Sequence, residues 1–409
     1  MISLGCPKNL VDSEKMLAGL AEAGCVITPD AADADVVLVN TCGFLQAARS
    51  ESLDVLGELK QLKDKDPHKR IVVAGCLVQR EQEALLQEAP YIDALVGVHG
   101  RQNVTQTILS VIGRTSGVPN DPPAGQVAAG QMGVTAGLSA AAGLVDLPCF
   151  DPAAAWSDRG RLRLTPRHYA YLRISEGCDQ KCTFCTIPAI RGPFRSKKPD
   201  EVLAEARELL VDGATELILI GQDTTGYGRD IGYEPGLAGL LRDINDLPGL
   251  GWVRLMYTYP REFSDSAIQA IAECDRVVKY VDMPLQHISD PVLRRMGRRT
   301  DRAAVEALLG RLRSTVPGMA VRTTFIVGFP GETEAQFQEL LAFVQQQCFD
   351  AVGVFAYSCE PGTPAADLDG QIDEAVKQQR VERLMLAQQA IAFDAARRKK
   401  GQTFQVIID

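Results

Sequence analysis

Short apolar runs alternate with helical stretches along most of the 409 residues, and this alternation restricts the chain to an α/β fold. Residues 36–40 and 71–74 are continuous valine-rich runs, whereas residues 44–63 and 79–90 have the pattern of helices. Continuous apolar runs are typical of parallel strands that are buried on both faces. The sequence therefore predicts an open parallel α/β sheet in residues 1–112.

A second series of strand–helix units begins at about residue 166. Its predicted strands lie near residues 169–174, 216–220, 252–256, 278–283, 322–327 and 351–356. Six units, separated by helices such as 199–211 and 333–347, predict a partial parallel barrel in residues 166–371 rather than the complete eight units of a TIM barrel. Residues 372–400 predict a long charged helix, and residues 401–409 predict the first strand of a further element.

The stretch between the two series, residues 113–165, has a different composition. It is rich in alanine, glycine and proline, and it keeps neither the period of a strand nor that of a helix. We interpret it as a linker or insertion that is partly disordered.

Three cysteines with the spacing C-x3-C-x2-C follow the first predicted strand of the second series. They are Cys178, Cys182 and Cys185, and they lie at the carboxyl end of a strand, where barrel active sites are built. Thiolates suit iron–sulfur clusters or zinc, but a closed structural zinc site needs four ligands. Three ligands leave one metal position open, as in a cluster whose free iron holds a small chelating ligand. A zinc knuckle with a distant fourth ligand is the alternative.

A second set of three cysteines is spread over residues 1–112. Cys6 follows a short apolar segment, and Cys42 and Cys76 each follow a predicted strand by two residues. Because ligands bind beyond the carboxyl ends of strands in an open parallel sheet, these three thiols are expected to converge on a second metal site. Three separate buried cysteines are the alternative. The other five have no shared spacing and predict core or loop positions: Cys25, Cys149, Cys274, Cys348 and Cys359.

Composition narrows the classes of function. The net charge of −9 and pI near 5.2 lack the basic footprint of most nucleic-acid binders, and they suit a basic protein partner. The sequence has neither a secretory signal at its start nor an apolar run long enough for a membrane span. We therefore expect a cytoplasmic protein without a membrane or DNA partner, whose eleven cysteines serve metal or redox chemistry rather than disulfides.

Polar segments follow four other predicted strands and are expected on the same rim as the C-x3-C-x2-C loop. These segments are residues 221–225, 284–287, 328–332 and 357–360. His287 is interpreted as a structural hydrogen-bonding residue. Two groups of basic residues are interpreted as solvated faces, with docking of an acidic partner or RNA as the alternative. One group is Arg294, Arg295, Arg298, Arg299 and Arg302, at helical spacing; the other is Arg191, Arg195, Lys197 and Lys198.

These motifs resemble a known family. The C-x3-C-x2-C loop with Phe184 before its last cysteine resembles the radical SAM (S-adenosylmethionine) superfamily, and the second set of cysteines resembles the methylthiotransferases within it. Residues 4–14 (Leu-Gly-Cys-Pro-Lys-Asn-Leu-Val-Asp-Ser-Glu) and 283–290 (Met-Pro-Leu-Gln-His-Ile-Ser-Asp) resemble the branch that modifies ribosomal protein uS12. The tRNA-modifying branch typically has Gln-Met in place of Pro7-Lys8.

The resemblance implies two 4Fe–4S clusters and SAM as cofactors, with the SAM-binding cluster on the C-x3-C-x2-C loop and the second cluster on Cys6, Cys42 and Cys76. It also implies conversion of an aspartate of uS12 to 3-methylthioaspartate, with electrons from a donor such as flavodoxin or ferredoxin. A tRNA methylthiotransferase, a zinc-binding module without activity, and an inactive cluster-binding fragment are the alternatives.

Three features depart from the family pattern. Only five residues precede Cys6, residues 401–409 are only the beginning of a small β (TRAM) domain, and Pro361 follows Glu360 where a second acidic residue is usual. The first two lead us to expect a truncated chain or an incomplete gene model.

Overall fold

The computed structural model describes residues 1–113, 144–148 and 156–408. Two compact units make up the chain: Met1–Asp151 with Gly160–Leu162 (unit 1), and Pro152–Arg159 with Arg163–Asp409 (unit 2). In the described parts of the chain, no helix is both long and apolar enough to cross a membrane.

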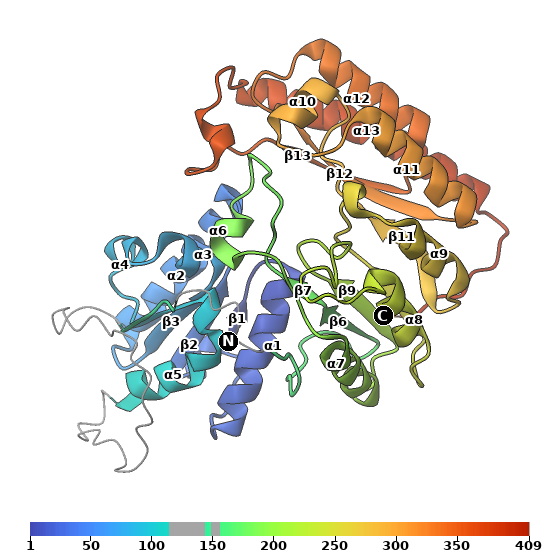
Figure 1. Cartoon of the computed structure of the whole chain (residues 1–409). Helices are drawn as coiled ribbons and strands as arrows, with labels where there is room; N and C mark the ends of the chain where they lie inside the picture. The colour runs from blue at the N-terminus through green and yellow to red at the C-terminus, as the bar shows by residue number, and fades with distance from the viewer. Residues whose placement is uncertain (114–143, 149–155, 409) are drawn as a thin grey trace. The chain divides into compact units, whose positions relative to one another are not determined.

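Unit 1 is built on a parallel sheet whose strands lie in chain order (Figure 1). The strands are β1 (Ile2–Ser3), β2 (Val36–Thr41), β3 (Arg70–Gly75), β4 (Ala94–Gly97) and β5 (Leu144–Asp146). The helices are α1 (Pro7–Glu22), α2 (Gln46–Lys65), α3 (Cys76–Glu81), α4 (Ala84–Glu88) and α5 (Val104–Gly113).

Helices cover both faces of this sheet. Val37, Val39 and Val73 pack against α2, α3 and α4, whereas Leu38 and Val72 pack against α1 and α5. Consecutive residues of one strand therefore enter opposite cores, which explains why β2 and β3 are apolar at every position rather than at alternate ones.

Unit 2 contains a six-stranded parallel sheet in the order β13-β12-β11-β10-β9-β6. Its strands are β6 (Tyr169–Arg173), β9 (Glu216–Ile220), β10 (Trp252–Leu255), β11 (Val277–Asp282), β12 (Ala320–Val327) and β13 (Ala351–Ala356). A short antiparallel pair, β7 (Ser175–Glu176) and β8 (Arg195–Ser196), follows β6. The described strands β6 and β13 are the two edges, so the sheet is an open partial barrel.

Helices cover the outer side of the unit 2 sheet (Figure 1). They are α7 (Pro199–Val211), α8 (Gly236–Asn245), α9 (Asp265–Glu273), α11 (Arg302–Thr315), α12 (Glu334–Gln347) and α13 (Glu374–Arg398). Alternate residues of β12 are buried beneath them, among them Val321, Phe325 and Val327. The residues that alternate with them, Arg322, Thr324 and Ile326, face the inner side of the partial barrel.

The predicted α/β fold class is confirmed, including the six strands of the second series. The domain limits stay predictions. Much of the predicted linker lies outside the described residues, but it also supplies β5 to the unit 1 sheet. Residues 402–408, predicted to begin a strand, have no regular secondary structure.

Candidate functional site

The cysteine loop of unit 2 begins where β7 ends. Gly177 has a φ of +75°, and a Cβ atom at this position would lie 2.0 Å from the carbonyl oxygen of Pro193. Only glycine fits such a turn without displacing the neighbouring backbone. The next residue, Cys178, donates its backbone N–H to the carbonyl of Gly192 at 3.1 Å. The first cysteine is thereby fixed against the turn that follows α6 (Ile187–Arg191).

The middle of the loop is held by distant parts of the chain. The backbone N–H of Thr183 donates to the carbonyl of Met296 at 3.0 Å, and its hydroxyl donates to the carbonyl of Arg295 at 2.8 Å. The carbonyl of Thr183 accepts from the backbone N–H of Ala365 at 2.9 Å. Segments that follow β11 and β13 therefore define the path of the loop between Cys182 and Cys185.

The thiols of this loop lie in a poorly solvated environment. Burial is the main cause that raises the pKa of Cys178 and of Cys185 from 9.0 to about 12. Negative charge nearby acts in the same direction, from Asp223 and Cys182 on Cys178 and from Cys182 and Cys178 on Cys185. In the metal-free protein both thiols therefore stay protonated at neutral pH. Bound metal ions would supply the positive charge that thiolates need in such a place.

Aromatic side chains cover one side of the loop. The ring of Phe184 meets that of Phe329 edge-to-face at 6.4 Å, and Phe329 meets Tyr357 at 5.2 Å. Phe329 and Tyr357 belong to a small buried cluster, against which Phe184 packs. This cluster joins the cysteine loop to the loops after β12 and β13 and shields it from water.

The segments predicted on the rim of the partial barrel do surround the cysteine loop. Gln180 donates to the carboxylate of Asp223, in the loop after β9, at 3.1 Å. His287 is fully buried, and its Nδ1 accepts from the backbone N–H of Ser289 at 3.0 Å. Its Nε2 lies 3.8 Å from a carboxylate oxygen of Glu332, which fits the predicted structural role.

The prediction that the first basic group forms one solvated helical face is wrong for Arg298, whereas Arg294 and Arg299 are exposed. Helix α10 (Asp290–Arg295) ends before Arg298, and α11 begins only at Arg302, so these arginines do not share one helix. Arg298 is 7% exposed, and its Nη1 lies 3.7 Å from the sulfur of Cys182. Sequence spacing did not reveal this contact, because the two residues are 116 positions apart.

The same interpretation is also wrong for two members of the second basic group, since Arg191 and Lys197 are each only 1% exposed. Lys197 donates to the carboxylates of Asp158, at 3.0 Å, and Glu205, at 2.5 Å. Arg191 donates to Glu176, 3.3 Å away. Carboxylates distant in sequence thus neutralise cations that the local pattern placed in solvent.

Glu176, two positions before Cys178, is the centre of a further buried network. Its carboxylate accepts from Arg173 at 2.8 Å, from Arg191 at 3.3 Å and from Gln222 at 2.8 Å. These partners lie on β6, at the end of α6 and in the loop after β9. The residue next to the cysteine turn is therefore tied to three elements of unit 2.

In unit 1 the three predicted cysteines follow three neighbouring strands. Cys6 is the N-cap of α1 just after β1, Cys42 directly follows β2, and Cys76 is the first residue of α3 after β3. Because β1, β2 and β3 are adjacent and parallel, the cysteines lie at one edge of the sheet.

Close contacts show how tightly these three loops meet. A Cβ atom at Gly5, whose φ is +95°, would lie 3.3 Å from the sulfur of Cys42. A Cβ atom at Gly43 would lie 2.6 Å from the Cα atom of Leu77, the residue after Cys76. Glycine before the first cysteine and after the second therefore lets the loops approach one another.

Asn9, on the first turn of α1, joins the three loops and was not singled out from the sequence. Its side-chain nitrogen donates to the carbonyls of Thr41, at 2.8 Å, and Leu4, at 3.1 Å. Its side-chain oxygen accepts from the thiol of Cys76 at 3.4 Å. Asn9 is fully buried, so these bonds are shielded from competing water.

Within residues 1–113, 144–148 and 156–408, no three cysteine, histidine or acidic side chains are already grouped around a single metal position. Whether each set of three cysteines can hold a metal cluster therefore depends on how its loops are arranged. In a cluster each thiolate binds its own iron, so cluster ligands are farther apart than the ligands of one ion. Of the five remaining cysteines, Cys274 is buried, Cys25 is half-buried, and Cys348 and Cys359 are exposed; Cys149 lies outside the described residues.

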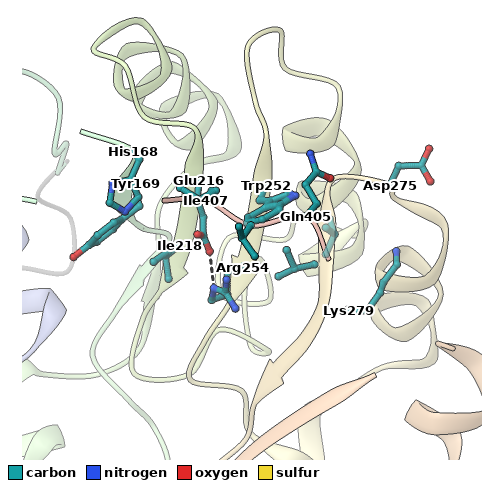
Figure 2. A pocket seen from close by; sticks show the side chains of 13 residues that line it. His168, Tyr169, Glu216, Ile218, Trp252, Arg254, Asp275, Lys279, Gln405 and Ile407 are labelled. Carbon is teal, nitrogen blue, oxygen red and sulfur yellow. Dashed lines mark hydrogen bonds and ion pairs between the residues drawn. The ribbon is translucent and has the colours of Figure 1, made fainter. Parts of the chain in front are cut away.

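A cavity of about 680 Å³ lies at the opposite, amino-terminal ends of the unit 2 strands (Figure 2). Tyr169, Glu216 and Trp252 line it as the first residues of β6, β9 and β10, and residues 405–407 lie against it. Glu216 is paired there with Arg254. The cavity is therefore separate from the cysteine loop, which follows the carboxyl end of β6.

Comparisons with known proteins agree with this fold. The sequence model of the radical SAM superfamily matches residues 172–344, and that of uncharacterized protein family UPF0004 matches residues 1–97. Among solved structures, the radical SAM methyltransferase TsrM from Kitasatospora setae has a TM-score of 0.58 at 17% identity. That match covers 89% of this chain and 74% of TsrM, and it supports the fold alone.

Curated relatives are much closer in sequence. The ribosomal protein uS12 methylthiotransferase RimO of Geotalea uraniireducens is 42% identical over 96% of this chain and 82% of its own length. RimO of Geobacter sulfurreducens is also 42% identical, over 100% of this chain and 86% of its own length.

The six-stranded open barrel, with its cysteine loop at the end of the first strand, defines a radical SAM enzyme. Membership of that superfamily implies SAM and a 4Fe–4S cluster as cofactors. Within it, the chain belongs to the family of ribosomal protein uS12 methylthiotransferases named RimO. The family resemblance seen in the sequence is thereby confirmed.

Proposed function

We propose that this chain converts an aspartate of ribosomal protein uS12 to 3-methylthioaspartate, using SAM and two 4Fe–4S clusters. The observation that carries the proposal is the meeting of the Cys6, Cys42 and Cys76 loops in unit 1, in addition to the cysteine loop of unit 2. One cluster suffices to start radical chemistry, whereas the insertion of sulfur needs a second site that can hold the sulfur atom.

Cys178, Cys182 and Cys185 hold the SAM-binding cluster in this proposal. They fit it because three thiols on one loop leave one iron without a protein ligand. A reduced cluster held by these three cysteines would supply the one electron needed to cleave SAM, with release of methionine, and so would provide the radical chemistry required at an unactivated carbon. The chain contributes burial and a fixed loop. The aromatic rings of Phe184, Phe329 and Tyr357 exclude water, and the turn at Gly177 sets the position of the first ligand.

Cys6, Cys42 and Cys76 hold the second cluster in the proposal. Their loops lie beyond the carboxyl ends of adjacent parallel strands, which is where ligands bind in open α/β sheets. Asn9 positions the loops before any iron is bound, since its hydrogen bonds join protein groups only.

The uS12 substrate is assigned from the relatives and is consistent with the charge of the chain. A net charge of −9 favours association with a basic protein more than with the phosphate backbone of RNA. The electron donor we propose is a small one-electron redox protein, flavodoxin or ferredoxin.

Two measurements test the proposal. Anaerobic reconstitution with iron and sulfide should give about eight irons per chain, and about four after Cys6, Cys42 and Cys76 are all replaced by alanine. Equal iron in both proteins would refute the assignment of a second cluster to Cys6, Cys42 and Cys76.

The second measurement concerns the substrate. The loaded protein, supplied with SAM and reductant, should add one methylthio group to uS12, detected by mass spectrometry of its aspartate-containing peptides. An equimolar tRNA pool in the same assay is the matched comparison. Modification of tRNA adenosines with unchanged uS12 would refute the proposed substrate in favour of the tRNA-modifying alternative.

A further inference from the structure

The guanidinium of Arg298 lies between an aromatic ring and a cysteine sulfur. Its central carbon is 4.1 Å from the centroid of the Tyr259 ring, within the range of a cation–π contact. Its Nη1 lies 3.7 Å from the sulfur of Cys182, and its Nη2 donates to the carbonyl of Pro284 at 2.7 Å. Three contacts from different segments therefore fix the orientation of this side chain.

Within the described part of the chain, the positive charge of Arg298 has no carboxylate partner. Its recorded contacts there are to a sulfur and a carbonyl oxygen rather than to a carboxylate, although the side chain is almost fully buried. Its Nε is also buried without a hydrogen-bond partner in that part of the chain. A buried cation is costly unless negative charge lies close by. Here the nearest candidate for that charge is the sulfur of Cys182.

The backbone holds this arrangement independently of the side chain. Gly297 has a φ of +69°, and a Cβ atom there would lie 2.4 Å from the carbonyl oxygen of Lys181. Thr183 bonds to the carbonyls of Arg295 and Met296. The residues on both sides of Cys182 thus contact the residues just before Arg298, so the distance between arginine and sulfur is set by the fold.

We propose that Arg298 raises the reduction potential of the cluster on Cys178, Cys182 and Cys185, by donating an N–H to the Cys182 sulfur and placing a positive charge beside it. The inference rests on the proposed cluster but not on the proposed substrate. Reduction adds one electron, from a donor of the flavodoxin or ferredoxin class, to a cluster whose thiolates are already negative. A fixed cation stabilises the reduced form more than the oxidised form, and hydrogen bonds to sulfur act in the same direction.

The test compares three variants of the reconstituted full chain. Arg298→Gln removes the charge, Arg298→Lys keeps it, and Arg299→Gln changes an exposed neighbour as the matched control. The potential is measured by a redox titration that follows the spin signal of the reduced cluster, with Cys6, Cys42 and Cys76 replaced by alanine so that one cluster is observed. We expect Arg298→Gln to titrate at a more negative potential, Arg298→Lys close to the parent, and Arg299→Gln at the parent value.

A full iron content together with the parent potential in Arg298→Gln would overturn the inference. If Arg298→Gln takes up no iron, Arg298→Lys decides: restored iron with a potential near the parent supports a role for the charge. Loss of iron in both variants would show that only the shape of the arginine matters, and it would overturn the inference. A parent protein that takes up no iron would instead refute the cluster assignment itself.

Discussion

The thiol of Cys76 donates a hydrogen bond to the side-chain oxygen of Asn9, 3.4 Å away, across 67 positions of the sequence. Because the nitrogen of the same amide binds the carbonyls that precede Cys6 and Cys42, one buried side chain is common to all three cysteine loops of unit 1.

Replacing Asn9 by alanine should weaken the second cluster. The substitution leaves two carbonyls and a thiol without their partner, which should lower the free energy of unfolding by about 1–3 kcal/mol. Iron content after reconstitution should fall toward that of the variant lacking Cys6, Cys42 and Cys76. The control is Asn103→Ala, at an exposed position of the same unit. Full iron in Asn9→Ala would show that the loops meet without this amide.

Replacing Gly177 by alanine should disrupt the cysteine loop of unit 2. The matched control is Gly249→Ala, because Gly249 has a φ of +83° with no atom within 4 Å of an added Cβ. The control should lose only the strain of a left-handed backbone, about 1–2 kcal/mol measured by denaturant unfolding. Gly177→Ala carries in addition the clash with Pro193, so it should lose more stability and also the iron of the SAM-binding cluster. Equal losses in the two variants would contradict the tight turn.

Glu176→Gln should destabilise unit 2 strongly. Its carboxylate is shared by Arg173 and Arg191, which are both buried, and removing one partner of a buried ion pair typically costs about 3–5 kcal/mol. Glu208→Gln is the comparison, because the Glu208–Arg159 pair is largely exposed and should contribute little. Urea unfolding curves measure both variants, and similar midpoints would argue against the buried network.

Tyr227→Phe should change how stability depends on pH. The Tyr227 hydroxyl donates to the carbonyl of Lys197 at 2.8 Å, and burial raises its pKa above the ordinary value of 10.0. Above that pH the unfolded chain loses the phenolic proton while the folded chain keeps it. The free energy of unfolding therefore falls as pH rises, until the folded pKa is reached.

The Tyr227→Phe variant should lack this pH-dependent contribution to the free energy of unfolding. At neutral pH it should be less stable by about 0.5–1.5 kcal/mol because one hydrogen bond is lost. Unfolding of both proteins at about pH 8 and about pH 11 measures the difference, since the other tyrosines contribute equally to each. A parallel loss of stability in the two proteins would show that Tyr227 ionises normally in the folded state.

The sequence predicted the strands and the cysteine positions because both are encoded locally. Continuous apolar runs such as 36–40 mark buried parallel strands, and the offset of Cys42 and Cys76 from their strand ends places both at one sheet edge. Side-chain partners are not encoded in this way. The local sequence around Arg298 does not distinguish it from a surface arginine, because its contact with Cys182 forms only in the folded chain. The same holds for Lys197, whose partners Asp158 and Glu205 lie elsewhere in the sequence.

Each strand of the unit 2 sheet pairs with the strand that precedes it in the chain, except that β9 pairs with β6 across the short β7–β8 pair. A growing polypeptide can therefore add these strands one at a time as it leaves the ribosome. Cys182 emerges 116 residues before the arginine that contacts its sulfur. Iron that reached the cysteine loop before α10 was translated would therefore meet a Cys182 that still lacked its contact with Arg298.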